Sequence, residues 1–168
     1  TVWQYTCRDA LATGTNYYLQ SYYYYIPESL TKVDITDATK IETAAFMNCA
    51  NITEINLNDE ITSVGDYAFR DCGVVNKSTD DLVVLGNILL KYKGSAITVD
   101  IPEGIKFIAS NAFYGNTKIL TINLAKETSD IGAYAFYNCK NLTVNVPRIS
   151  GTLTIQSNAF TNTGSVKY

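Results

Sequence analysis

The fold is decided by the stretch Val64-Gly65-Asp66-Tyr67-Ala68-Phe69-Arg70-Asp71-Cys72, which recurs along the chain with small changes. Its most constant part is the dipeptide Ala-Phe, found at Ala45-Phe46, Ala68-Phe69, Ala112-Phe113, Ala135-Phe136 and Ala159-Phe160. The phenylalanines of successive Ala-Phe copies are 23, 44, 23 and 24 residues apart, and the interval of 44 is close to two periods with one altered copy between. A fixed period of about 20–30 residues indicates a solenoid, in which similar coils stack on one another.

Each copy has an aliphatic residue five positions before the phenylalanine and a small or capping residue three positions before it. The aliphatic residues are Ile41, Val64, Ile108, Ile131 and Ile155. The small or capping residues are Thr43, Asp66, Ser110, Ala133 and Ser157, and four of the five have a side chain that can accept from the first amides of a helix. Because the apolar positions share one helical face, each copy predicts a short helical turn that buries one stripe.

A strand is predicted after each of these turns. The strand pattern is clearest at Ile52-x-x-Ile55-x-Leu57, Ile119-x-x-Ile122-x-Leu124 and Leu142-x-Val144-x-Val146. The step of two between the last aliphatic residues is the period of a strand with one face buried and one exposed. Each coil is therefore expected to contain a strand, a second extended segment and a helical turn, which together make an α/β solenoid.

The repeat resembles that of the BspA-like leucine-rich-repeat family, which reads Ala-Phe-x-x-Cys-x-x-Leu-x-x-Ile-x-Leu-Pro and then Ile-Gly. The best matches are Ala45-Phe46-x-x-Cys49-x-x-Ile52-x-x-Ile55-x-Leu57, Ala135-Phe136-x-x-Cys139-x-x-Leu142, Ile101-Pro102 and the pairs Val64-Gly65 and Ile131-Gly132. The resemblance implies a right-handed leucine-rich-repeat superhelix of about six to seven coils, with a parallel β-sheet and short helical turns. It also implies a non-enzymatic adhesion protein of bacterial type, secreted or displayed on the cell surface.

The repeats divide the chain into an N-terminal segment, residues 1–27, and a solenoid, residues 28–168, within a single domain. Residues 73–97 form one irregular coil, because the Ala-Phe motif is missing there. The run at residues 82–92 is centred on Gly86-Asn87 and predicts a hairpin in its place. The chain begins at Thr1 without a methionine, so we expect it to be part of a longer protein.

The N-terminal segment is rich in aromatic residues. They include Trp3, Tyr5 and a candidate aromatic patch of Tyr17, Tyr18, Tyr22, Tyr23, Tyr24 and Tyr25. One interpretation is a cap, or a first coil whose repeat pattern has worn away, that covers the exposed end of the core. The end coil of a solenoid needs such a cover, because it has no neighbouring coil on that side. The other is a tyrosine-rich contact surface, since tyrosine offers a large amphipathic area for protein or glycan ligands.

Composition excludes several classes of partner. The formal net charge is −3 and only 17% of residues are charged, with no run of Lys or Arg, so no nucleic acid is expected as a partner. No stretch of 18 apolar residues occurs, so we expect no direct membrane insertion. The sequence has no histidine and no Cys-x-x-Cys pair, which disfavours zinc and Cys–His catalysis, and we expect no cofactor.

Three of the four cysteines, Cys49, Cys72 and Cys139, share one position of the repeat. Stacked coils hold equivalent side chains roughly 4.8 Å apart, slightly more than the Cβ separation of a disulfide. We therefore expect reduced, buried thiols that act as small apolar side chains. The state of Cys7 stays open.

The residues between the strand aliphatics are the candidate binding face. They are Lys32, Asp34, Glu54, Asn56, Thr98, Asp100, Thr121, Asn123, Thr143 and Asn145. Such a face, rich in Asn and Thr, suits hydrogen bonding to a protein or glycan on a host or neighbouring cell, although solvated strand residues give the same pattern. The first functional hypothesis is an adhesion module, and the alternative is a glycan-targeting or spacer repeat of a larger secreted enzyme. Neither the ligand nor the oligomeric state follows from the sequence.

Overall fold

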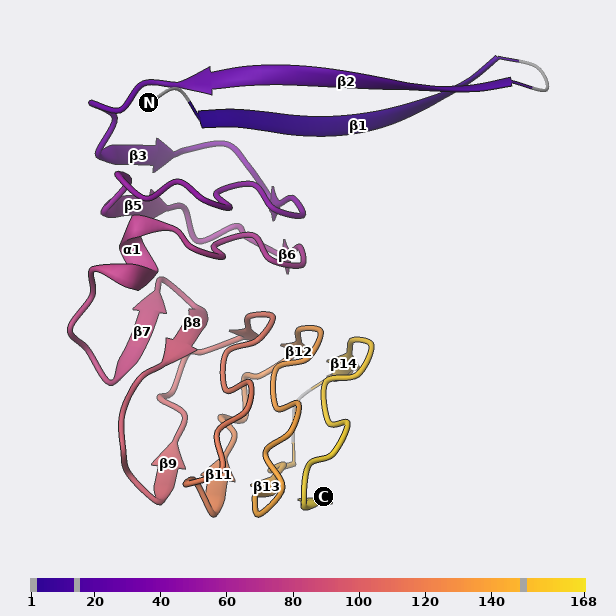
Figure 1. Cartoon of the computed structure of the whole chain (residues 1–168). Helices are drawn as coiled ribbons and strands as arrows, with labels where there is room; N and C mark the ends of the chain where they lie inside the picture. Colours follow the sequence, from indigo (N-terminus) through magenta and orange to yellow (C-terminus); the bar gives the residue numbers. More distant parts are fainter. Residues whose placement is uncertain (1–2, 14–15, 149–150) are drawn as a thin grey trace.

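The computed structural model describes the backbone of residues 3–13, 16–148 and 151–168, with side chains described from Ile26 onward except at 149–150. From β3 (Lys32–Ile35) onward the chain forms a solenoid, and strands of successive coils pair in parallel (Figure 1). The predicted solenoid with parallel sheets is confirmed. Of the residues described, only α1 (Gly73–Asn76) is helical.

Each coil contributes to one or both of two strand stacks, which we call the first and the second sheet; each stack is made of two separately hydrogen-bonded sheets. The first sheet contains β3 (Lys32–Ile35), β5 (Glu54–Leu57), β9 (Thr98–Asp100), β11 (Thr121–Asn123), β13 (Thr143–Asn145) and β15 (Ser165–Lys167). The second sheet contains β4 (Lys40–Ile41), β6 (Ser63–Val64), β8 (Ile88–Tyr92), β10 (Phe107–Ile108), β12 (Asp130–Ile131) and β14 (Thr154–Ile155). Both stacks are interrupted between the second and third of these strands, where no pairing joins β5 to β9 or β6 to β8.

The segment around each Ala-Phe is a tight turn, so the predicted helical turn with its capping residue is wrong. The residues two before and two after each phenylalanine have positive φ angles. They are Ala44, Tyr67, Asn111, Tyr134 and Asn158 before it, and Asn48, Asp71, Gly115, Asn138 and Asn162 after it. Two left-handed residues four positions apart are incompatible with a right-handed helix. The apolar stripe is still buried, because the turn folds Ala and Phe onto the core.

Main-chain hydrogen bonds to the next coil replace those of a helix. The amide of Phe113 donates to the carbonyl of Ala135 at 2.8 Å, and that of Phe136 donates to Ala159 at 2.8 Å. In the first turn the amide of Phe46 donates to Ala68 at 2.7 Å. The turns are therefore a third ladder between coils, alongside the two sheets.

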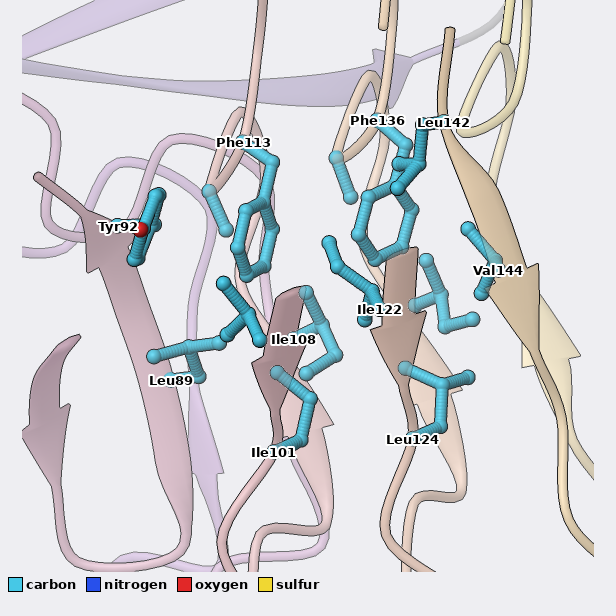
Figure 2. Close-up of a cluster of buried hydrophobic side chains, with 14 of the residues drawn as sticks. Leu89, Tyr92, Ile101, Ile108, Phe113, Ile122, Leu124, Phe136, Leu142 and Val144 are labelled. Atoms are coloured by element: carbon cyan, nitrogen blue, oxygen red, sulfur yellow. The ribbon is translucent and has the colours of Figure 1, made fainter. Parts of the chain in front are cut away.

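The phenylalanine rings stack along the solenoid axis inside this ladder (Figure 2). Ring centroids lie 5.1 Å apart for Phe113 and Phe136, and 5.2 Å apart for Phe136 and Phe160. Phe113 and Phe136 are fully buried, among the strand aliphatics Ile122 and Val144. Rings and aliphatics from neighbouring coils therefore form one continuous core in this half of the chain.

The irregular coil contains the predicted hairpin. β7 (Leu82–Leu85) pairs antiparallel with β8, and Gly86 between them has a φ of 56°, which suits glycine. β8 then takes the place of a second-sheet strand, with Leu89 opposite Ile108 of β10. The chain reaches Tyr92 only three residues after Leu89, whereas Phe113 follows Ile108 by five. This coil thus lacks a full turn.

The N-terminal segment forms a long antiparallel hairpin of β1 (Trp3–Thr13) and β2 (Asn16–Ile26), beside β3 and extending beyond the coils (Figure 1). Its antiparallel pairing differs from the parallel pairing of a coil. A capping role for residues 1–27 stays a prediction, because it depends on side chains outside the described set.

Candidate functional site

The ten residues predicted for the binding face lie on two separate sheets, β3–β5 and β9–β15, and form two rows on each. The register aligns Lys32 with Glu54 and Asp34 with Asn56 in the first pair of strands. In the longer part it aligns Thr98, Thr121 and Thr143 in one row, and Asp100, Asn123 and Asn145 in the other. None of the ten is buried, while Ile55, Val99, Ile122 and Val144 between them are. We call these ten residues the polar face.

Side chains of the polar face bond to one another along the rows. Asn123 donates through Nδ2 to Asp100 Oδ1 at 2.6 Å, and Asn145 Nδ2 donates to Asn123 Oδ1 at 2.6 Å. Asn56 Nδ2 donates to Asp34 Oδ1, also at 2.6 Å. Each asparagine has a second amide hydrogen for a ligand. These bonds fix the orientation of the amides before any ligand binds.

The charged end of the polar face contains an ion pair. Lys32 Nζ lies 2.6 Å from Glu54 Oε1 and 4.0 Å from Asp34 Oδ1. The hydrogen bond to Glu54, its charge and that of Asp34 raise the pKa of Lys32. Both partners are about half exposed, so this pair contributes little to stability.

Two further residues extend the rows, and the sequence reasoning missed both. Ser165 and Lys167 of β15 align with Thr143 and Asn145, and the hydroxyls of Thr143 and Ser165 lie 3.0 Å apart. The sequence does contain a signal for this strand, because polar Ser165 and Lys167 alternate with apolar Val166, which is half-buried.

A groove opens where the irregular coil lacks its turn. It has a volume of about 450 Å³, within the range of ligand pockets. It lies between the turn at residues 64–71 and the turn at residues 109–114, with Leu90 and Lys91 of β8 between them. Asp66 and Ser110 join the two turns, since Ser110 Oγ donates to Asp66 Oδ1 at 2.7 Å. One indirect sign of this groove in the sequence is the interval of 44 residues between Phe69 and Phe113.

The groove carries charge and aromatic surface. Lys91 is half-buried and donates through Nζ to the carbonyl of Asn111 at 2.8 Å, and burial lowers the pKa of its ammonium. The guanidinium of Arg70 lies 5.5 Å from the ring centroid of Tyr67 and pairs with Asp71 at 3.4 Å. Tyr114 is 49% exposed at the other wall. The groove thus combines cationic and aromatic side chains with the carboxylates of Asp66 and Asp71.

The cysteine side chains that are described are free and buried, as predicted. Burial, with a smaller effect of the neighbouring Cys72, raises the pKa of Cys49 to about 11. Burial also raises the pKa of Cys72 and of Cys139. These thiols are protonated at neutral pH and suit packing rather than chemistry.

Within the described part of the chain, no cluster of three potential ligands for a metal is present. The same residues contain no helix with the length and apolar character of a membrane span. The six tyrosines of the candidate aromatic patch all lie on β2, and their side chains are outside the described set. The aromatic patch therefore stays a prediction.

Comparison with known proteins gives one match. A family model described as BspA type leucine-rich repeat region matches six copies, over residues 17–143 and 84–168. No curated protein and no solved structure matches the chain.

Proposed function

The chain belongs to the BspA-type leucine-rich repeat family, and on that premise we propose that it is a non-enzymatic binding module whose polar face holds a protein ligand. Repeats of this family suggest an interaction or adhesion role for the domain. The observation that supports this use of the polar face is the ladder Asp100–Asn123–Asn145. An array of amides already held in place loses little side-chain entropy when a ligand binds.

The ligand is a protein surface that offers polar groups at a regular spacing. Successive strands of a sheet are about 4.8 Å apart, so each row repeats hydrogen-bonding groups at that interval. The part formed by β9, β11 and β13 is rich in Thr and Asn and has one carboxylate, Asp100. Affinity there depends on hydrogen bonds more than on charge, and it should change little with salt.

We place the parent protein at the cell surface or outside the cell, as an adhesin that binds other cells or extracellular matrix. This placement rests on family membership, since BspA-type repeats often occur on bacterial surface proteins. The alternative, a targeting or spacer repeat of a secreted enzyme, is one outcome of the test below.

The test is binding of the purified domain to immobilised extracellular-matrix proteins and to glycans, measured by surface plasmon resonance. One variant carries Thr121→Ala, Asn123→Ala, Thr143→Ala and Asn145→Ala. A matched control carries Thr117→Ala, Lys118→Ala and Lys140→Ala, exposed positions outside the strands. Circular dichroism must show that both variants keep the fold.

Loss of protein binding in the polar-face variant alone supports the proposal. Equal binding by both variants excludes this face as the binding surface. Binding to glycans alone, or to no ligand, favours a targeting or spacer repeat.

A further inference from the structure

Regular turns of this solenoid are joined by hydrogen bonds from alternate main-chain amides. In the first turn, the amides of Ala44, Phe46 and Asn48 donate to the carbonyls of Asp66, Ala68 and Arg70 over 2.9, 2.7 and 2.8 Å. The turns that contain Phe113 and Phe136 donate from the same three positions. A regular turn therefore presents three donors, at alternate residues, to the coil that follows.

The turn that borders the groove has the same three donors but no acceptors for them. They are the amides of Tyr67, Phe69 and Asp71, and no carbonyl or side chain among the described residues accepts from them. The amides between them donate within the turn, for example Arg70 to the carbonyl of Tyr67 at 3.0 Å. The three residues line the groove. In the turns of Phe46, Phe113 and Phe136 the corresponding donors are bonded to the next coil, so this row is an open edge of the turn ladder that faces the groove.

The irregular coil explains why the row has no partner. Its Tyr92 stacks on Phe113 at 5.4 Å and donates its amide to Ala112 at 3.0 Å, so it continues the ladder on the far side of the groove. On the near side no turn faces Phe69. The missing turn leaves a space of about 450 Å³ with apolar residues Leu90 and Ala109 in its lining.

Lys91 adds an unpaired charge to this space. It is half-buried, and no carboxylate of the described residues lies within 4.0 Å of its Nζ. Its hydrogen bond to the carbonyl of Asn111 uses one of three ammonium hydrogens. A ligand with an acidic group would therefore neutralise a charge that the fold leaves without a counter-ion.

We propose that the groove binds a short acidic peptide segment, whose main-chain carbonyls accept from Tyr67, Phe69 and Asp71. Three donors at alternate residues match the carbonyls that a peptide presents on one side, the principle by which peptides add to open edges. A single phosphate or carboxylate is too small to engage all three. An apolar side chain of the peptide fills the space beside Phe69, and an acidic one pairs with Lys91. The inference is independent of the polar face, which lies on the first sheet.

Hydrogen exchange of the free protein, followed by nuclear magnetic resonance, is the first test. Tyr67, Phe69 and Asp71 amides should exchange at least about tenfold faster than those of Phe46, Phe113 and Phe136, which are bonded between coils. Equal protection of both sets would overturn the proposal, because the row would then be paired in solution.

Peptide binding is the second test, with a displayed library of random dodecapeptides selected on the whole domain. An enriched peptide is synthesised and titrated into the labelled protein. It should contain Asp or Glu and should slow exchange of the three amides. Lys91→Met should weaken binding about tenfold, as expected for loss of one charge-assisted hydrogen bond. The matched control is Lys140→Met, at an exposed position outside the groove, which should bind as the original does.

A groove-filling variant, Ala109→Trp, should abolish binding, and if it does not fold, the result with Lys91→Met decides. A library without enrichment, or a peptide that protects only strands of the first sheet, overturns the proposal. The proposal is also overturned if soluble oligosaccharides protect the three amides from exchange and no peptide does. The polar-face variants described above should bind the peptide normally, which separates this inference from the proposed function.

Discussion

The ring of Tyr92 lies 5.4 Å from that of Phe113, so a tyrosine of the irregular coil takes the place that phenylalanine has in the regular turns. Its amide also makes the bond to Ala112 that a regular phenylalanine makes to the next alanine. Tyr92 is 6% exposed, and its hydroxyl accepts from the amide of Ala96 at 2.8 Å. The residue therefore joins the core to the loop that leads into β9.

Tyr92→Phe should reduce the free energy of unfolding by about 0.5–1.5 kcal/mol, since it removes the hydroxyl's short bond from the Ala96 amide and its longer bond to the Ala96 carbonyl but keeps the ring. Tyr92→Ala should cost about 3–5 kcal/mol, because it also removes the stacked ring. Urea unfolding of both variants measures this. Equal losses in the two would mean that the ring contributes nothing.

Phe136 should be among the most sensitive core positions, because it is fully buried between two rings, those of Phe113 and Phe160. Phe136→Ala should destabilise the protein by about 3–5 kcal/mol. Phe46 is only partly buried and stacks on Phe69 alone among the described rings, so Phe46→Ala should cost less. Thermal unfolding of the two variants compares them, and a larger effect at Phe46 would contradict the continuous core.

The strained turn makes a stabilising substitution available at Ala44, which has a φ of 59°. Relief of left-handed strain by glycine is worth about 1–2 kcal/mol, and the added freedom of the unfolded chain offsets about 0.4–1 kcal/mol. Ala44→Gly should therefore stabilise the fold by about 0.5–1 kcal/mol. The matched control is Ala112→Gly, at a buried position without positive φ, which should destabilise it. A loss of stability in Ala44→Gly would mean that this turn relaxes in solution.

Burial of the thiols predicts an alkaline loss of stability. The pKa of Cys49 is raised to about 11, so the folded state holds the proton between pH 9 and 11 while the unfolded state releases it. The contribution of this group to the free energy of unfolding is thus constant below about pH 9 and falls between pH 9 and 11. Urea unfolding at pH 8 and pH 10 should show a smaller decline for Cys49→Val than for the original protein. An identical decline in both would indicate that other groups cause it.

The same burial predicts that a thiol reagent at pH 8 reacts slowly with Cys49, Cys72 and Cys139 until denaturant is added. Rapid labelling of any of the three in the folded protein would contradict its position in the core.

Strands and core could be predicted from the sequence because their signal is periodic. Ile122 is fully buried between Thr121 and Asn123, as alternation requires. The turns could not be predicted in the same way. Tyr67 and Tyr134 have positive φ angles, and tyrosine is not a residue type from which a left-handed backbone would be predicted. The asparagines Asn48, Asn138 and Asn162 do indicate positive φ angles, because asparagine tolerates the left-handed conformation better than most residues.

The groove was harder still to predict, since it arises from a turn that the chain lacks. Only the long interval between Phe69 and Phe113 indicated it, and an interval does not say whether the space is filled. Leu90 and Lys91 of β8 line it, and the three unpaired amides follow from the shortened path of this coil. The polar face, in contrast, was predicted residue by residue, because a sheet with one buried face leaves alternate positions outside.

The bond from Asn123 to Asp100 gives the polar face a charge-sensitive position. Asn123→Asp would place a second carboxylate where an amide now donates at 2.6 Å, so two like charges would lie opposite each other on adjacent strands. At the exposed surface this should cost about 0.5–1 kcal/mol at low salt and less at 0.5 M salt. Protonation in acid removes the repulsion between the two carboxylates, so stability relative to the original should recover as pH falls toward 4. Urea unfolding across pH and salt measures this, and a loss that is the same at pH 7 and pH 4 would show that the amide acts through its shape rather than its charge.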